Sequence, residues 1–128
     1  MKTDLYGLRI LVTEDNLLYA DIITELLTMR HASVSCVHSG EEAIRRIAED
    51  GEPYDAVLMD VQMPGMNGYE ATQRIHALSR SAKLPVFAMT ASTQECDRRS
   101  ARRAGMKAFL SKPIEMAKLD QALGLAYA

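Results

Sequence analysis

Five side chains able to bind a metal ion or a phosphate stand at, or just beyond, the ends of four short apolar runs. They are Glu14, Asp15, Asp60, Thr90 and Lys112. If the apolar runs are parallel strands, their carboxyl ends meet at one edge of a sheet, which is where open α/β sheets bind ligands. We therefore expect three carboxylates, one hydroxyl and one ammonium to converge in a single site.

The carboxylates decide the chemistry of this site. Two unpaired carboxylates about 4 Å apart repel each other by about 4 kcal/mol at an effective dielectric constant near 20, so the cluster needs a proton, a lysine or a divalent cation. Mg²⁺ suits it, because this ion prefers hard oxygen ligands and is usually completed by a phosphate. Asp60 could then act as a nucleophile that forms an acyl phosphate, while Lys112 and Thr90 neutralise the phosphoryl oxygens.

Each of these side chains, taken alone, has a simpler explanation. A single Asp or Glu at the end of a strand more often caps the following helix than takes part in catalysis. That explanation becomes weak when all five residues fall at the strand ends where a shared site requires them.

Apolar runs and amphipathic segments alternate along the chain. The predicted strands are 8–13, 34–37, 56–60, 85–89 and 108–110. The predicted helices are 16–30, 40–49, 69–78, 93–104 and 115–123. The first helix is expected to turn inward the side chains of Tyr19, Ile22, Ile23, Leu26 and Met29. Apolar strands that alternate with helices indicate a doubly wound α/β fold, with a five-stranded parallel sheet covered on both faces.

Length and composition indicate a single folded domain. The 128 residues, 48% of them hydrophobic, suffice for one buried core. The net charge of −2 gives no overall attraction to nucleic acid, and Cys36 and Cys96 lack the spacing of a metal or redox motif. Because no apolar run is long enough to span a membrane, we expect the protein in the cytoplasm, or on the cytoplasmic side of a membrane as part of a larger protein.

The motifs around these residues resemble those of response-regulator receiver domains. The matching segments are Glu14-Asp15-Asn16, Met59-Asp60-Val61-Gln62-Met63-Pro64-Gly65-Met66-Asn67-Gly68, Thr90-Ala91 and Lys112-Pro113. The similarity extends over essentially the whole chain, with the motifs in the family's order and spacing. It implies one receiver domain over 1–128, with a core of about 7–124, and a flavodoxin-like (βα)5 fold with strand order 2-1-3-4-5.

The resemblance also implies a role for each residue of the site. Asp60 would be the phosphoacceptor, and Lys112 and Thr90 would contact the phosphoryl group. Mg²⁺ would be held by Glu14, Asp15, Asp60 and the backbone carbonyl of Gln62. Thr90 and Phe109 would form the switch pair, and the Lys112–Pro113 peptide bond would be cis.

Three residues depart from the usual receiver pattern. They are Phe109 in place of the commoner Tyr, Asn67 in place of Asp, and Thr13 in place of an apolar residue. Phe109 cannot donate a hydroxyl hydrogen bond when it is exposed, so the resemblance does not define the details of the switch. Phosphorylation of Asp60 is still expected.

The implied partner is a histidine kinase or a histidine phosphotransfer domain, which would supply the phosphoryl group. The motifs look most like those of receivers in hybrid sensor histidine kinases, although stand-alone regulators share them. Within a hybrid kinase the chain would belong to an enzyme; alone it would catalyse only its own phosphorylation and dephosphorylation. Leu17 is expected to be exposed beside the site, where it could dock a phosphodonor helix or be an ordinary exposed leucine.

A basic face is expected on the helix at 93–104, formed by Arg98, Arg99, Arg102 and Arg103. In receiver domains this helix belongs to the helix 4, strand 5 and helix 5 face, which serves output and homodimer formation. Because acidic residues accompany the arginines, we expect a solvated or partner-contacting surface rather than direct contact with nucleic acid, and no membrane contact by this domain.

Three other functions use the same fold or chemistry. An Asp-nucleophile phosphatase would resemble its family in a DxDx[TV] motif, but the residue two positions after Asp60 is Gln62. A flavin or nucleotide binder would need a GxGxxG motif or a phosphate loop, and the sequence contains neither. A pseudo-receiver that acts only as a protein-interaction module is disfavoured by the complete set of acidic, threonine and lysine residues.

Overall fold

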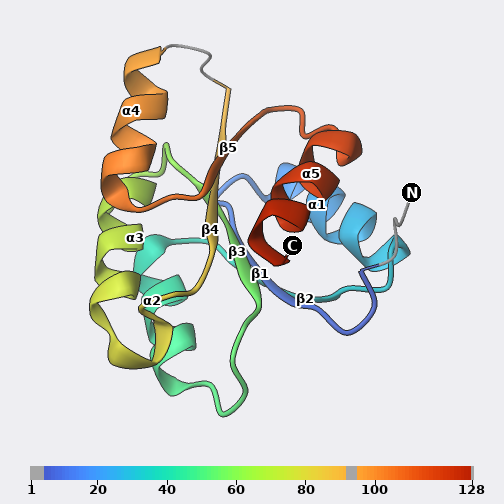
Figure 1. Cartoon of the computed structure of the whole chain (residues 1–128), viewed down its shortest axis with the longest axis horizontal. Helices are drawn as coiled ribbons and strands as arrows, with labels where there is room; N and C mark the ends of the chain where they lie inside the picture. Colours follow the sequence, from blue (N-terminus) through green and yellow to red (C-terminus); the bar gives the residue numbers. More distant parts are fainter. Residues whose placement is uncertain (1–4, 92–94, 128) are drawn as a thin grey trace.

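The computed structural model describes residues 5–91 and 95–127, which form a five-stranded sheet between two layers of helices (Figure 1). The strands are β1 (Arg9–Thr13), β2 (Ser33–Val37), β3 (Ala56–Asp60), β4 (Val86–Thr90) and β5 (Ala108–Ser111). The helices are α1 (Leu17–Met29), α2 (Gly40–Glu49), α3 (Gly68–Ala77), α4 (Glu95–Ala104) and α5 (Met116–Tyr127), with one short 3-10 helix, η1 (Ser79–Ser81). The predicted alternation of strands and helices is confirmed.

The strand order brings the ends of β1 and β3 together. The sheet runs β2-β1-β3-β4-β5, and all neighbouring strands are parallel, as predicted. The chain leaves β1 for β2 on one side and crosses to β3 on the other, so the order reverses between β1 and β3. Thr13 at the end of β1 pairs with Met59, the residue before Asp60. The switch point of the sheet therefore lies beside Asp60.

Helices cover both faces of the sheet, with α1 and α5 on one side and α2, α3 and α4 on the other (Figure 1). Alternate residues of β1 belong to two buried clusters, one on each face of the sheet. Ile10 and Val12 share a cluster with Leu119 of α5, whereas Leu11 shares the other with Ile75 of α3. All residues of β3 and β4 are buried. Each fully buried Leu or Ile contributes about 1.5–3 kcal/mol, so the two cores fix the sheet and hence its carboxyl edge.

Side chains with N-capping oxygens start α1, α2 and α3. Asn16 accepts the N–H of Tyr19 at 3.1 Å, and Ser39 caps α2 in the same way. Asn67 accepts the N–H of Glu70 at 2.9 Å. Since Asn and Asp are comparable N-caps, the departure at Asn67 keeps the start of α3 intact.

Element boundaries differ from the predictions mostly by one residue. The main exceptions are α5, which continues to Tyr127 rather than 123, and η1, whose three residues carry no apolar periodicity from which it could be predicted. Of the helix predicted at 93–104, residues 93 and 94 lie outside the described part of the chain. No helix within residues 5–91 and 95–127 combines the length and the apolar character needed to cross a membrane.

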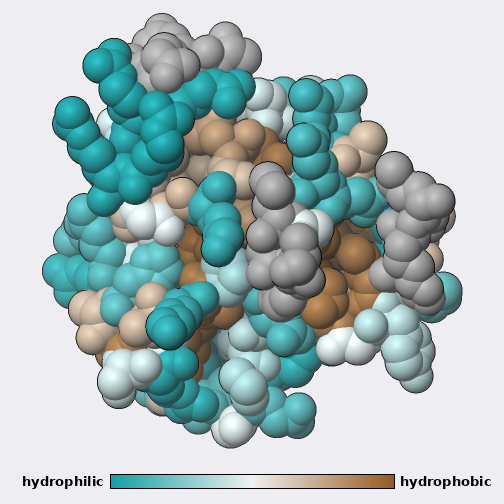
Figure 2. Space-filling view, in the orientation of Figure 1, coloured by the Kyte–Doolittle hydropathy of each residue, from teal (hydrophilic) through white to brown (hydrophobic). Residues whose placement is uncertain are grey.

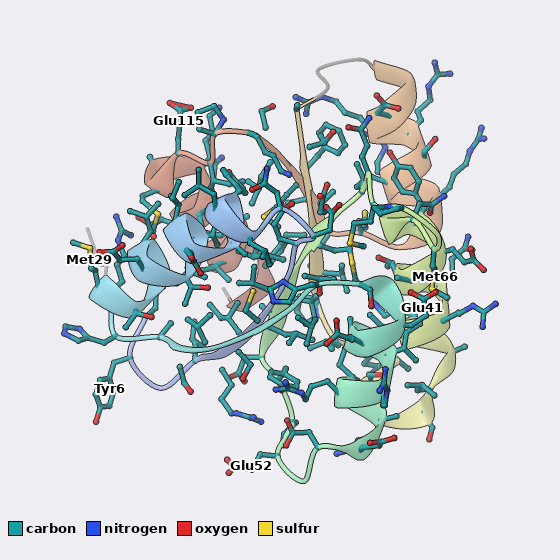
Figure 3. All side chains as sticks on the ribbon, turned by 180° about the vertical axis from the view of Figure 1, so that it is seen from behind. Tyr6, Met29, Glu41, Glu52, Met66 and Glu115 are labelled. Carbon is teal, nitrogen blue, oxygen red and sulfur yellow. The ribbon has the colours of Figure 1, made fainter. Side chains whose placement is uncertain are left out.

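The expected inner face of α1 is partly wrong. Ile23 is buried, but Ile22 is 45% exposed and Met29 is 70% exposed. The inner face is set by Ala20, Ile23 and Leu27. Because successive helical residues turn by about 100°, Ile22 lies a quarter-turn away from Ile23, and Met29 lies about 200° from Leu27. Met29 accordingly points away from the sheet in Figure 3.

Candidate functional site

Three carboxylates meet at the carboxyl ends of β1 and β3. One oxygen each from Glu14, Asp15 and Asp60 lies within 4.8 Å of the other two. Glu14 is 1% exposed and Asp60 is 3% exposed, whereas Asp15 is open to solvent. The pairing of β1 with β3 explains the convergence, because Glu14 directly follows β1 and Asp60 ends β3. The structure thus brings together the three carboxylates that the sequence indicates.

Lys112 supplies a positive charge to this cluster. Its Nζ donates to Glu14 Oε1 at 2.7 Å and lies 3.4 Å from Asp60 Oδ2. Burial lowers the pKa of Lys112, but the hydrogen bond to Glu14 and the charge of Asp60 outweigh this, and the pKa is raised overall. Lys112 follows β5, and its backbone N–H donates to the carbonyl of Thr90 at 2.7 Å. The Lys112–Pro113 peptide bond is cis.

The carboxyl group of Asp60 is hard to ionise. Burial is the largest cause, and it raises the pKa of Asp60 to about 7, with Glu14 adding to the rise. The N–H of Gln62, which donates to Asp60 Oδ1 at 3.0 Å, and the charge of Lys112 act in the opposite direction. One positive charge therefore does not fully neutralise the site, and a further cation is favoured there.

Thr90 and Phe109 lie on neighbouring strands. Thr90 ends β4 and is 1% exposed, and β4 runs beside β3 with Met89 opposite Asp60. Thr90 therefore lies at the same edge of the sheet as Asp60. Phe109 on β5 is half-buried, and the guanidinium of Arg98 sits 5.0 Å from its ring centroid. The structure thus places Phe109 beneath α4.

Two neighbours of the site have roles that the sequence analysis misses. In the sequence Gly68 is only the last residue of the motif that contains Asp60, yet a Cβ there would lie 2.4 Å from the backbone oxygen of Asp60. The available signal is the Asn67-Gly68 pair, an N-cap followed by a residue that lets the helix approach β3. The sequence indicates Tyr19 only as a core residue; its hydroxyl accepts the N–H of Ile114 at 2.9 Å. No sequence spacing could reveal that contact.

Comparisons with known proteins agree with this geometry. The family model of the response regulator receiver domain matches residues 10–124. The chain is 37% identical over 116 residues to the sensor protein GacS of Pseudomonas syringae, covering 88% of this chain and 13% of that protein. It is 34% identical over 117 residues to the signal transduction histidine-protein kinase BarA of Escherichia coli, covering 91% and 12%. The chain therefore spans only a small part of these relatives.

Solved structures give the same result. The receiver domain of the sensor histidine kinase PA1611 from Pseudomonas aeruginosa, described with a magnesium ion coordinated in its active-site cleft, matches with a TM-score of 0.85 and 32% identity. The match covers 95% of this chain and 99% of that one. A chemotaxis protein of Vibrio cholerae, CheY4, at 21% identity and a TM-score of 0.85, shares the fold. The family match, the relatives and the acidic edge of the sheet agree. The chain belongs to the response regulator receiver domain family and is homologous to the phosphorelay receivers of hybrid histidine kinases.

Proposed function

We propose that this receiver domain takes a phosphoryl group from a phosphohistidine onto Asp60 in a Mg²⁺-dependent reaction, and signals by the resulting change of conformation. The observation that carries the proposal is the acidic cluster, in which one oxygen from each of Glu14, Asp15 and Asp60 lies within 4.8 Å of the others. The ammonium of Lys112, 3.4 Å from Asp60 Oδ2, completes a site suited to a phosphoryl group.

The donor set fits Mg²⁺. The protein ligands we propose are Glu14, Asp15, Asp60 and the backbone carbonyl of Gln62. All of them offer hard oxygen atoms, and the exposed Asp15 leaves one side open for water and phosphate. When bound, the ion supplies the positive charge that keeps Asp60 ionised and that neutralises an oxygen of the incoming phosphoryl group.

In the proposed transfer, a carboxylate oxygen of Asp60 attacks the phosphorus atom. The new P–O bond forms as the P–N bond to the donor histidine breaks, and the imidazole leaves with the electron pair and takes up a proton. Lys112 and Thr90 then neutralise the phosphoryl oxygens.

The signal is proposed to leave through the face formed by α4, β5 and α5. Thr90 would turn toward the phosphoryl group, and Phe109, two residues before the Thr90 partner Ser111, would respond. Arg99, Arg102 and Arg103 are exposed on α4, and Figure 2 shows hydrophilic residues gathered over this helix. This surface is the proposed site of a homodimer or an output contact.

The phosphoryl donor is proposed to be a histidine kinase or a histidine phosphotransfer domain, met in the cytoplasm. Leu17 is 62% exposed and Leu18 is 72% exposed, two and three residues after Asp15. The expected exposure of Leu17 is therefore confirmed. An apolar pair beside the open side of the site suits the apolar face of a donor helix.

The proposal is tested by incubating the protein with Mg²⁺ and acetyl phosphate and measuring its intact mass. We expect a gain of one phosphoryl group that is abolished by chelator and by Asp60→Asn. No gain in a folded protein that binds Mg²⁺ would contradict the proposal and indicate a receiver that acts by binding alone.

A further inference from the structure

Tyr19 bridges α1 to the loop that carries Lys112. Its hydroxyl oxygen accepts the backbone N–H of Ile114 at 2.9 Å, and its ring centroid lies 4.8 Å from Lys112 Nζ. One side chain therefore contacts both the backbone that follows Lys112 and the ammonium group itself.

The hydroxyl contact fixes the loop on the side away from the sheet. The backbone N–H of Lys112 is bonded to Thr90 at the end of β4. Pro113 has no N–H, so Ile114 carries the next backbone donor along the chain. Tyr19 accepts that donor from α1, on the other side of the loop. The segment from Lys112 to Ile114 is thus held between β4 and α1.

The ring contact differs in kind from the other contacts of Lys112. The ammonium bonds Glu14 and approaches Asp60, both of which are needed elsewhere once a metal ion or a phosphoryl group enters. The aromatic face carries no formal charge and is not a ligand for either group, so entry of a metal ion or a phosphoryl group does not take the ring away from the ammonium. Burial raises the pKa of Tyr19, which keeps its hydroxyl un-ionised at neutral pH.

We propose that Tyr19 is a positioning residue for Lys112, holding its loop through the hydroxyl group and its ammonium through the ring during phosphoryl transfer. The inference rests on the proposed function of the site. It predicts that the hydroxyl and the ring make separate contributions, which two variants can distinguish. Phenylalanine keeps the ring contact and loses the hydroxyl contact, whereas leucine loses both.

The test compares Tyr19→Phe and Tyr19→Leu with a control, Tyr54→Phe. Tyr54 is also a tyrosine with a bonded hydroxyl, which donates to Asp50 at 2.7 Å, but it precedes β3 at the opposite end of the sheet. Three quantities are measured: the rate of phosphorylation by acetyl phosphate, the affinity for Mg²⁺ by calorimetry, and the NMR shift of the Lys112 ε-methylene, assigned with Lys112→Arg.

We expect the phosphorylation rate to fall about fivefold in Tyr19→Phe and about tenfold or more in Tyr19→Leu. The affinity for Mg²⁺ should change less than the rate, because Lys112 is not a metal ligand. The upfield shift that the ring imposes on the Lys112 ε-methylene should remain in Tyr19→Phe and vanish in Tyr19→Leu. Tyr54→Phe should leave all three quantities at the wild-type value.

Equal rates in wild type and Tyr19→Leu, or a Lys112 signal that is insensitive to the loss of the ring, would overturn the inference. A rate loss matched by Tyr54→Phe would also overturn it, because the effect would then be one of stability. If the wild type itself takes up no phosphoryl group, the proposed function fails, and the NMR comparison still decides whether Tyr19 holds Lys112.

Discussion

At the scale of single residues, the protonation of Asp60 links the site to the stability of the protein. Burial raises its folded-state pKa to about 7, from 3.8 as the ordinary value. Between these two pH values the folded protein binds more protons than the unfolded chain, so the folded state loses stability as the pH rises from about 4 to about 7. Without an added cation, ionisation of Asp60 therefore lowers the free energy of unfolding.

Replacing Asp60 by Asn should remove this pH dependence. Without metal, we expect Asp60→Asn to raise the free energy of unfolding by about 1–3 kcal/mol more at pH 8 than at pH 4.5, because the amide has no charge to bury. Urea denaturation of both proteins at the two pH values measures the difference. A gain that is the same at both pH values would contradict the assigned pKa.

A second residue that lowers the stability of the folded protein is Thr13, through its buried hydroxyl. Thr13 is 0% exposed, and its Oγ1 has no hydrogen-bond partner among the residues that the structure describes. We expect Thr13→Val to raise the free energy of unfolding by about 1 kcal/mol, since it replaces a buried unpaired hydroxyl by a methyl group of similar size.

The control for this prediction is a threonine with a bonded hydroxyl. Thr72 is equally buried, but its Oγ1 donates to the carbonyl of Gly68 at 2.8 Å. Thr72→Val should therefore lower the free energy of unfolding by about 1 kcal/mol. If urea denaturation showed the same sign for both variants, hydroxyl pairing would not be the cause.

At the scale of elements, the start of α3 packs directly on the end of β3. A Cβ at Gly68 would lie 2.4 Å from the oxygen of Asp60 and 2.8 Å from Val61 Cα, both backbone atoms. We expect Gly68→Ala to lower the free energy of unfolding by about 1–3 kcal/mol, and to slow phosphorylation because Asp60 must move. Thermal denaturation and the acetyl phosphate assay measure the two effects.

A glycine in open surroundings provides the comparison. Gly124 lies within α5, and a Cβ added to it would meet no atom within 4 Å among the described residues outside its own helix backbone. Gly124→Ala should raise the free energy of unfolding by about 0.5–1 kcal/mol, because alanine is the better helix former. Stability loss of similar size in both variants would show that the close approach at Gly68 is not decisive.

The elements also show what the sequence could and could not predict. Strands that are apolar up to their last residue, such as β3 and β4, give an unambiguous pattern, and their last residues are Asp60 and Thr90. The predicted inner face of α1 is partly wrong because the apolar residues Ile22 and Met29 face solvent. The contact of Tyr19 is beyond prediction, because its partner Ile114 is 95 residues away and meets it only through the fold.

At the scale of the whole molecule, binding of Mg²⁺ should stabilise the fold. A ligand that binds only the folded state at about 100 times its dissociation constant adds about 2.7 kcal/mol to the free energy of unfolding. We expect the rise in melting temperature with Mg²⁺ to be larger at pH 8 than at pH 5.5, because protonated Asp60 competes with the metal. A rise that is equal at both pH values, or that survives in Asp60→Asn unchanged, would contradict the proposed ligands.

In the resting protein, the ion pair between Lys112 and Glu14 places a positive charge where the metal ion is proposed to bind. The ammonium occupies one oxygen of a carboxylate that the cation is proposed to bind. Metal entry would then break the ion pair between Glu14 and Lys112, and would add positive charge to a cluster that one ammonium does not fully neutralise. Lys112, released from Glu14, would then be available to the phosphoryl group, so binding of the cation would prepare the site for the group that follows. The resting domain would therefore keep its site assembled through this ion pair, and would become reactive when the cation replaces the lysine at Glu14.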